Sequence, residues 1–301
     1  MSIRFDGRVA IVTGAGNGLG RAYAMALAAR GAKVVVNDLG GAVDGSGGSQ
    51  GPAQKVVDEI IAAGGEAIVN TDSVADSDGA AAIVATAVDK WGKVDIVINN
   101  AGIVRDKSFH NMTLDDFEFV VRVHLFGSAF VSHAAFPVMR ENNYGRILMV
   151  TSTSGLYGNF GQANYGSAKA GVVGLMNTLR IEGARYNINV NAIAPLAVTR
   201  MSESAPIFDD TDKSLSSPEP VAAMAAYLVS EDCTVSGQIM AATSGYYSRI
   251  EFVEGAGVRT DKTAPATPEM IAEKFGAISD MTDARPWDDV VANLRHAMGL
   301  D

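Results

Sequence analysis

The sequence predicts one α/β domain built on a doubly wound parallel sheet of about seven strands, followed by a C-terminal helical extension. Short apolar, β-branched runs alternate along the chain with segments of helical pattern. The first of these runs ends in a cluster of glycines, which is typical of a turn from a strand into a helix in this class. No Pro/Ser-rich linker or charge block divides the 301 residues. We therefore expect a main domain over residues 1–245 and an extension over residues 246–301.

Seven apolar runs predict the strands. The first, RVAIVT at residues 8–13, has the near-continuous hydrophobicity of a strand buried on both faces. The remaining six share this character and lie at residues 33–37, 66–70, 94–99, 145–151, 188–194 and 238–242.

The segments between these runs predict helices. They lie at residues 19–30, 52–63, 76–91, 113–142, 164–186 and 218–229. Gly31 is a C-cap for the first, and Pro137 is expected to interrupt the long fourth helix near its end. Two short capped helices are expected to start at Thr267-Pro268 and near Trp287 in the extension. Right-handed crossovers between these strands give a doubly wound sheet. Ligands bind to such sheets outside the carboxyl ends of the strands.

Composition narrows the class of protein. The formal net charge of −10 gives no overall attraction to nucleic acid or to an anionic membrane. We expect no membrane span, because no apolar run approaches about 18 residues. A single cysteine, Cys233, excludes an intramolecular disulfide, and no apolar leader follows Met1. A cytoplasmic location is expected.

A glycine-rich stretch, residues 40–51, follows the second predicted strand directly. Its sequence, GGAVDGSGGSQG, is typical of a flexible loop. We interpret it as a tolerated surface insertion.

The glycines after the first strand predict a dinucleotide site. Gly14, Gly18 and Gly20 have the spacing Gly-x3-Gly-x-Gly, and Asn17 and Leu19 lie between them. Without side chains, the backbone can approach a pyrophosphate at the helix N-terminus, where free N–H groups favour an anion. A plain Gly-rich turn is the alternative.

Asp38, at the end of the second strand, predicts which dinucleotide binds. It follows Gly20 by 18 residues. A carboxylate there can accept hydrogen bonds from both ribose hydroxyls of NAD and would repel a 2′-phosphate. Asp38 could instead simply cap a turn.

Two further loops lie at the same predicted edge. Asp72 and Ser73, after the third strand, could contact adenine or serve as a helix N-cap. Asn99, Ala101 and Gly102, after the fourth, have small side chains that let backbone lie against the cofactor, although a simple turn has the same composition.

Tyr165 and Lys169 predict the proton chemistry. Four residues apart on a helix, they share one face. A nearby ammonium and a cationic nicotinamide both favour the phenolate, so Tyr165 can exchange a proton with an alcohol or carbonyl and Lys169 can also hold the nicotinamide ribose. Ser152, at the end of the fifth strand, can bond the substrate oxygen. Together these side chains predict alcohol oxidation or carbonyl reduction.

These motifs together resemble the short-chain dehydrogenase/reductase family over residues 5–245. The set is Thr13-Gly14-x3-Gly18-x-Gly20, Asn99-Asn100-Ala101-Gly102, Ser152, Tyr165-x3-Lys169 and Asn191-x3-Pro195. Narrower stretches resemble the (3R)-hydroxyacyl-CoA dehydrogenase unit of peroxisomal multifunctional enzymes of type 2. They are residues 37–41, 122–125, 158–165, 193–195 and the tail pattern of residues 255–269. The resemblance implies a Rossmann-like fold, NAD, a β-oxidation substrate and a dimer whose C-terminal segment helps to close the active site.

Some positions depart from the family. His124 stands where most members have an asparagine that helps to hold a proton-relay water, so it is either a catalytic residue or a core histidine bonded to backbone. Pro195 is followed by Leu196 instead of glycine, and Thr199 lies where a hydroxyl could bond the carboxamide. The histidines His110, His133 and His296 show no metal spacing, so no metal is expected.

The leading interpretation is an NAD-dependent dehydrogenase of 3-hydroxyacyl-CoA thioesters. A hydroxysteroid or steroid-side-chain-CoA dehydrogenase would use the same residues, and so would a 3-oxoacyl-carrier-protein reductase, which Asp38 disfavours. A catalytically silent scaffold is the alternative from another class. Residues 201–217 are expected to form a lid over the substrate, and their sequence does not indicate which substrate is preferred.

The extension predicts self-association. Apolar positions such as Phe275 and Leu294 recur between charges from residue 267 to residue 300. Such a stripe must be buried against something. A homodimer or a dimer of dimers is expected, with a tail folded back on its own domain as the alternative.

Overall fold

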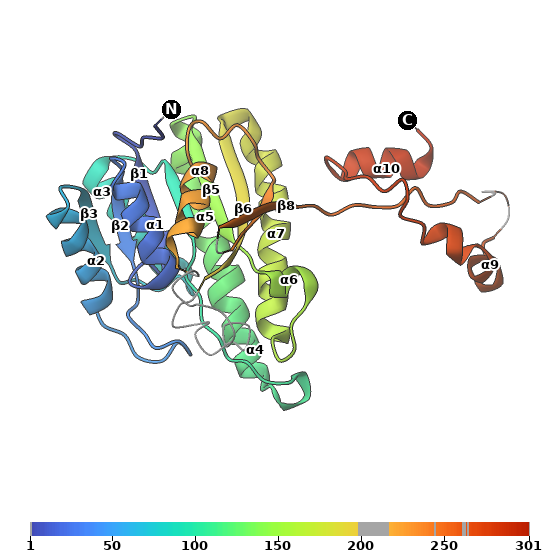
Figure 1. Cartoon of the computed structure of the whole chain (residues 1–301), viewed down its shortest axis with the longest axis horizontal. Coiled ribbons are helices and arrows are strands. Elements are labelled where there is room, and N and C mark those ends of the chain that lie inside the picture. The colour runs from blue at the N-terminus through green and yellow to red at the C-terminus, as the bar shows by residue number, and fades with distance from the viewer. Residues whose placement is uncertain (1, 198–216, 244, 261–262, 264, 301) are drawn as a thin grey trace. The chain divides into compact units, whose positions relative to one another are not determined.

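The computed structural model describes residues 2–197, 217–243, 245–260, 263 and 265–300. The chain divides into two compact units, Met1–Arg249 and Ile250–Asp301. The first unit carries the sheet and eight helices of the described residues, and the second carries two short helices, α9 and α10 (Figure 1).

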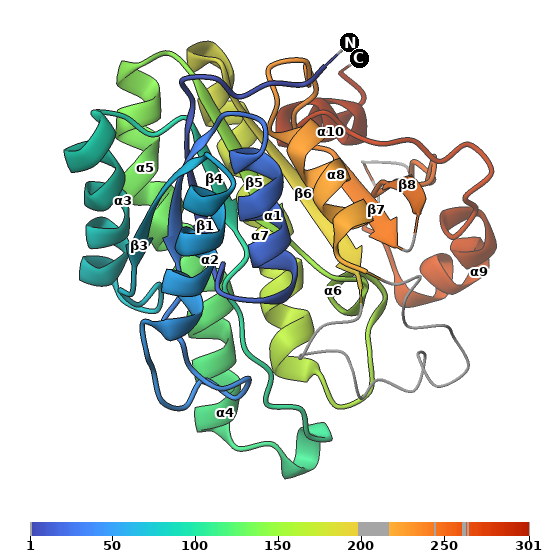
Figure 2. The same cartoon turned by 60° about the vertical axis from the view of Figure 1, so that its left-hand side comes forward.

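The sheet has eight strands in the order β3-β2-β1-β4-β5-β6-β7-β8 (Figure 2). Their bounds are β1 Val9–Thr13, β2 Lys33–Asn37, β3 Glu66–Asn70, β4 Ile96–Asn99, β5 Gly145–Val150, β6 Ile188–Leu196, β7 Ile239–Thr243 and β8 Tyr246–Ile250. Neighbours from β3 to β7 pair in parallel. The strand order reverses between β1 and β4, which is the switch point where such sheets bind ligands. The predicted doubly wound fold is confirmed.

Strand β8 lies beyond the point where the sequence suggested that the sheet ends. It follows β7 after two residues, and a connection that short joins only antiparallel neighbours. Sequence reasoning missed this strand because it lies at the sheet edge and carries exposed Tyr246 and Tyr247 instead of an apolar run.

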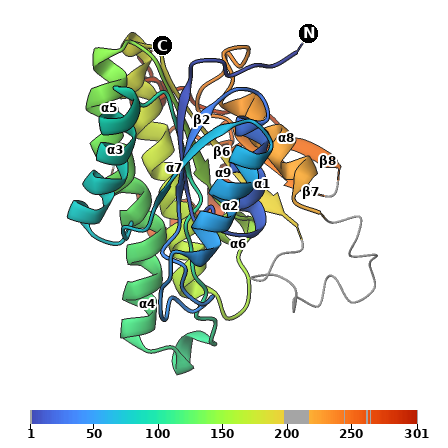
Figure 3. The same ribbon diagram turned by 90° about the vertical axis from the view of Figure 1, so that its left-hand side faces the viewer.

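Helices cover both faces of the sheet. In the first unit they are α1 Gly18–Ala28, α2 Gly51–Ala62, α3 Ser77–Trp91, α4 Leu114–Val121, α5 Gly127–Glu141, α6 Thr153–Tyr157, α7 Ala163–Gly183 and α8 Glu219–Leu228. α1, α2 and α8 lie on one side of the sheet, and α3, α4, α5 and α7 lie on the other (Figure 3).

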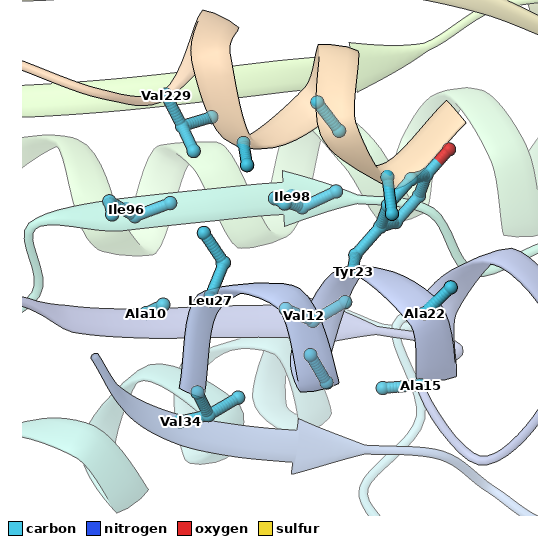
Figure 4. Packing of buried hydrophobic residues seen from close by; sticks show 14 of the residues in the cluster. Ala10, Val12, Ala15, Ala22, Tyr23, Leu27, Val34, Ile96, Ile98 and Val229 are labelled. Atoms are coloured by element: carbon cyan, nitrogen blue, oxygen red, sulfur yellow. The ribbon is translucent and has the colours of Figure 1, made fainter. Parts of the chain in front are cut away.

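The core between the sheet and α1 is made of aliphatic side chains. Leu27 of α1 lies over Ile96 and Ile98 of β4, and Val229 closes the cluster beside α8 (Figure 4). Each is buried, and fully burying such a side chain stabilises the fold by about 1.5–3 kcal/mol. This packing holds the N-terminus of α1 at the end of β1.

The long helix after β4 differs from the expectation. Pro137 does not interrupt it, because α5 continues to Glu141. The irregular stretch lies earlier, where residues Arg122–Phe126 are π-helical between α4 and α5. By length and composition alone, Leu114–Glu141 could cross a membrane. In this fold it packs on β4, β5, α3 and α7, as core helices of similar composition do.

The second unit is held together around Glu254. Its backbone pairs with Arg285, and its carboxylate accepts a hydrogen bond from Trp287 Nε1 at 2.6 Å. Helix α9, Pro268–Ile278, starts at the Thr267 cap, and α10, Val290–Met298, starts at the Asp289 cap. Neither helix buries a residue.

Candidate active site

A cavity of about 880 Å³ opens at the carboxyl ends of the strands. The loops after β1, β2, β3, β4, β5 and the end of β6 line it. Most residues predicted for the site meet there: Gly14, Asn17, Gly18, Leu19, Gly20, Asp38, Asp72, Ser73, Ala101, Gly102, His124, Ser152, Tyr165, Lys169 and Pro195.

The glycine turn after β1 has the conformation that the motif requires. Gly14 and Gly18 have φ of 63° and 52°, which side chains rarely allow. A Cβ on Gly20 would overlap the Gly14 carbonyl oxygen. The N-cap of α1, Asn17, makes no side-chain cap hydrogen bond, so the first N–H groups of the helix are available to an anion. These features fit a dinucleotide pyrophosphate.

Asp38 joins the glycine turn to the end of β2. Its Oδ2 accepts a hydrogen bond from the Gly16 N–H at 2.8 Å, and its Oδ1 accepts one from the Gly40 N–H at 2.7 Å. The carboxylate is half-buried and held from both sides. Each oxygen retains a lone pair that could accept a ribose hydroxyl.

Buried amides position Asp72. Asn70 Nδ2 donates to Asp72 Oδ2 at 2.7 Å, and Asn37 Nδ2 donates to the Asp72 carbonyl at 2.9 Å. The neighbouring Ser73 hydroxyl accepts the Ala75 N–H at 3.1 Å. Neither residue is the helix N-cap that one interpretation predicted, because α3 is capped by Asp76, which accepts the Gly79 N–H. Both Asp72 and Ser73 line the cavity.

Asn99 does not reach the cavity. Its side chain is buried and donates to Ser132 Oγ at 2.9 Å, on the helix side of the sheet. Its neighbour Asn100 lines the cavity instead and donates to the carbonyls of Thr13 and Gly14 at 2.9 and 3.0 Å. Side chains alternate along a strand, so a shift of one residue changes which one faces the site.

Ser152, Tyr165 and Lys169 converge as predicted. Ser152 is the N-cap of α6, and its Oγ accepts the Ser154 N–H at 3.1 Å, which leaves its own O–H free to donate. Lys169 Nζ lies 5.6 Å from the centroid of the Tyr165 ring and donates to the Val150 carbonyl at 2.6 Å. Ser152 lies between β5 and α6, and the other two side chains come from α7.

Burial dominates the protonation of this group. It raises the pKa of the Tyr165 phenol, and the hydrogen bond with Ser152 opposes that rise. Burial also lowers the pKa of Lys169 to about 7. The lowering of the phenol pKa that the sequence predicts is thus outweighed by desolvation here. A bound cationic nicotinamide would favour the phenolate.

His124 has features of both interpretations that the sequence left open, a core histidine bonded to backbone and a residue beside the catalytic group. It is buried in the π-helical segment, and its Nε2 lies 2.8 Å from the Ile103 carbonyl oxygen and 3.1 Å from the Ile103 nitrogen. Its ring also stands perpendicular to that of Tyr165, with centroids 5.0 Å apart. Burial holds its pKa well below the ordinary value, so the imidazole is neutral. Its part in a proton relay stays a prediction.

The glycine-rich stretch is not a detached surface insertion. Gly41, Ala42, Val43 and Gly45 line the cavity. The Val43 carbonyl accepts the Val104 N–H at 3.1 Å, so the stretch binds the loop after β4. The stretch is an exposed loop, as expected, but it also lines the cavity, because glycine content predicts a loop without predicting where it packs.

Sequence reasoning also missed some cavity residues and named others that cannot be placed. Asp106, Phe119, Tyr157 and Gln162 line the cavity but belong to no motif, so their spacing gave no signal. Leu196, which replaces the glycine of the family, lines the cavity too. Thr199 lies outside the described residues, and so does all of the predicted lid except Ser217.

Comparison with known proteins agrees with this geometry. A family model described as short chain dehydrogenase matches residues 8–207. A short-chain type dehydrogenase/reductase of Mycobacterium tuberculosis is 48% identical over 278 residues, which are 92% of this chain and 96% of that protein. Peroxisomal multifunctional enzyme type 2 of Drosophila melanogaster is 47% identical over 94% of this chain, but the match spans only 47% of the fly enzyme.

Solved structures give the same result. The full-length fly multifunctional enzyme superposes with a TM-score of 0.82 at 38% identity, covering 98% of this chain and 49% of that one. A 7α-hydroxysteroid dehydrogenase complexed with NADH and 7-oxo glycochenodeoxycholic acid gives 0.72 at 32% identity, covering 80% and 95%. In agreement with its motifs and its site, the chain belongs to the short-chain dehydrogenase family and is an oxidoreductase with a nicotinamide cofactor.

Proposed function

We propose that the protein oxidises 3-hydroxyacyl-CoA thioesters to 3-oxoacyl-CoA with NAD, as a step of β-oxidation-type lipid degradation. The observation that carries the reaction type is the convergence of Ser152, Tyr165 and Lys169 in the cavity that also holds the glycine turn and Asp38. The substrate class is supported by the likeness to multifunctional enzymes, among them a yeast protein named peroxisomal hydratase-dehydrogenase-epimerase, 47% identical over 94% of this chain.

We propose a task in alcohol oxidation for each side chain. When substrate binds, Ser152 donates its O–H to the substrate oxygen instead of to Tyr165 and orients the substrate. Tyr165, as phenolate, takes the proton of the substrate hydroxyl at its Oη while the C–H bond gives up a hydride. The nicotinamide ring, when bound, supplies the hydride acceptor. Lys169 Nζ lies 5.6 Å from the centroid of the Tyr165 ring, where the protonated form of this lysine, whose pKa is about 7, stabilises the phenolate.

NAD is proposed over NADP because of Asp38. Both of its oxygens are held by backbone N–H groups, so the carboxylate cannot swing away from a 2′-phosphate. Like charges brought together in a half-buried site repel strongly. A ribose with two free hydroxyls meets acceptors at the same place.

A hydroxysteroid or a steroid-side-chain-CoA is the second candidate substrate. The bile-acid dehydrogenase among the structural neighbours favours it. Both candidates use the same catalytic side chains, so only the substrate distinguishes them.

We also propose a homodimer or a dimer of dimers in the cytoplasm. Phe275, Val290 and Val291 are 61%, 68% and 61% exposed, and α9 and α10 bury no residue within the chain. A partner subunit would cover them. The single cysteine is buried, which suits a reducing compartment.

A substrate panel tests the proposal. Purified protein is given NAD with (3R)-3-hydroxyacyl-CoA thioesters of increasing length, the (3S) forms, and hydroxysteroids, and NADH is followed by absorbance. We expect the highest kcat/KM with a (3R)-3-hydroxyacyl-CoA. Turnover of steroids alone would favour the second candidate, and no turnover of any alcohol would contradict both.

A further inference from the structure

The loop after β4 carries three charged residues in a row, Arg105, Asp106 and Lys107. Arg105 Nη1 lies 3.1 Å from Asp116 Oδ1, and Lys107 Nζ lies 3.3 Å from Asp116 Oδ2. Both cations therefore pair with the same carboxylate, in the first turn of α4. Among the described residues, no cation lies within ion-pair distance of Asp106.

Neutral groups hold Asp106 in place. Its Oδ2 accepts a hydrogen bond from Gln162 Nε2 at 2.7 Å, and Gln162 Oε1 accepts one from Asn159 Nδ2 at 3.0 Å. The Lys107 N–H donates to the Gly161 carbonyl at 2.9 Å, which ties the two loops together. An amide partner fixes the carboxylate without cancelling its charge.

Asp106 shares the cavity with the catalytic group. Asp106, Gln162 and Asn159 line it together with Ser152 and Tyr165. The negative charge of Asp106 raises the pKa of the Tyr165 phenol, in addition to the larger effects of burial and of the bond with Ser152. The field of this carboxylate thus reaches the place where a substrate hydroxyl must bind.

The position of the reacting carbon decides what that field does. In a 3-hydroxy compound, the carbonyl carbon C1 is two bonds from C3, where oxidation occurs. A free 3-hydroxy acid carries a negative charge at C1, whereas a thioester is neutral there. We propose that Asp106 is a specificity-determining residue whose unpaired carboxylate disfavours free 3-hydroxy carboxylates and so selects acyl thioesters; this rests on the proposed function.

The expected effect of the Asp106 charge on the binding of a free 3-hydroxy acid follows from Coulomb's law. Two negative charges about 8 Å apart in an effective dielectric constant of about 30 disfavour binding by roughly tenfold. Asp106 is exposed, so salt and water reduce this to about fivefold at ordinary ionic strength.

The test is the variant Asp106→Asn, whose amide oxygen can still accept the bond from Gln162. The probes are (3R)-3-hydroxybutanoate and its N-acetylcysteamine thioester, which differ in charge at C1 and lack the phosphates of CoA. Asp115→Asn is the matched control, because it removes one exposed carboxylate from the first turn of α4 outside the cavity. His124 and Lys169, the other titratable groups against Tyr165, are unchanged in both variants.

We expect Asp106→Asn to raise the ratio of free-acid to thioester kcat/KM about fivefold or more, with a smaller gain at high salt. The acidic limb of its kcat profile, on which Tyr165 must lose its proton, should also move to lower pH, because Tyr165 loses a negative neighbour. Asp115→Asn should change neither quantity. A ratio that Asp106→Asn leaves unchanged, while the thioester is still oxidised, would overturn the role of Asp106 alone. Failure of the wild type to oxidise the thioester would overturn the proposed function and this inference with it.

Discussion

Asp38→Asn should change the choice of cofactor. The variant replaces one carboxylate oxygen by an amino group, so one of the two bonds from Gly16 and Gly40 is lost and the negative charge disappears. A 2′-phosphate carries a charge of about −1.5 to −2. At about 5 Å and an effective dielectric constant of about 20, it would be repelled by roughly 6 kcal/mol. Because Asp38 is only half-buried, screening halves this to about 3 kcal/mol, or about 100-fold.

Initial rates with NAD and NADP measure the effect. The wild type should favour NAD by at least about 100-fold in kcat/KM, and Asp38→Asn should bring the two cofactors within about tenfold of each other. Asp89→Asn, which removes an exposed charge on α3, is the control and should keep the wild-type preference. Equal use of both cofactors by the wild type, or an unchanged preference in Asp38→Asn, would refute the reasoning.

Three further predictions concern the glycine turn, the buried lysine and the tail. Gly20→Ala should abolish cofactor binding in calorimetry, because its Cβ would overlap the Gly14 carbonyl oxygen. The control Gly174→Ala on α7 places its Cβ in open space and should bind the cofactor normally. Normal binding by Gly20→Ala would contradict the proposed cofactor site. The pKa of Lys169 falls from 10.5 in the unfolded chain to about 7 in the folded protein. Between these pH values the unfolded chain binds more protons, so the free energy of unfolding should rise with pH, by at most about 1.4 kcal/mol per pH unit. Urea unfolding at pH 7.5 and 9.5 should show a smaller increase in the free energy of unfolding for Lys169→Met than for the wild type. An equal increase in the two proteins would show that Lys169 is charged when folded. Truncation after Gly257 should weaken self-association in light scattering and raise KM for the acyl-CoA more than for NAD; an oligomeric truncated chain with unchanged KM would exclude the tail as a dimer element.

The sequence predicted the parts of this protein that depend on local pattern. Apolar runs such as KVVVN at β2 are strands because both of their faces are buried, and α1 and α7 follow from their helical periodicity. Tyr165 and Lys169 could be paired because helical spacing alone places them on one face.

Features that depend on tertiary packing could not be predicted in this way. The π-helical segment around His124 has no spacing signature, and Pro137 is tolerated where a break was expected. The side chain that faces the cavity after β4 is Asn100 instead of Asn99, a shift of one residue that periodicity does not resolve. Asp106 escaped notice because its importance comes from the pairing of its neighbours with Asp116.

The most direct test of the central claim compares wild type with Tyr165→Phe in the oxidation of a (3R)-3-hydroxyacyl-CoA by NAD. The variant keeps the half-buried ring and its contact with His124 but removes the group that takes the proton. We expect kcat to fall by about 10²- to 10⁴-fold while NAD binds with nearly unchanged affinity, and Tyr186→Phe, away from the cavity, to behave as wild type. Near-normal turnover by Tyr165→Phe would contradict the account.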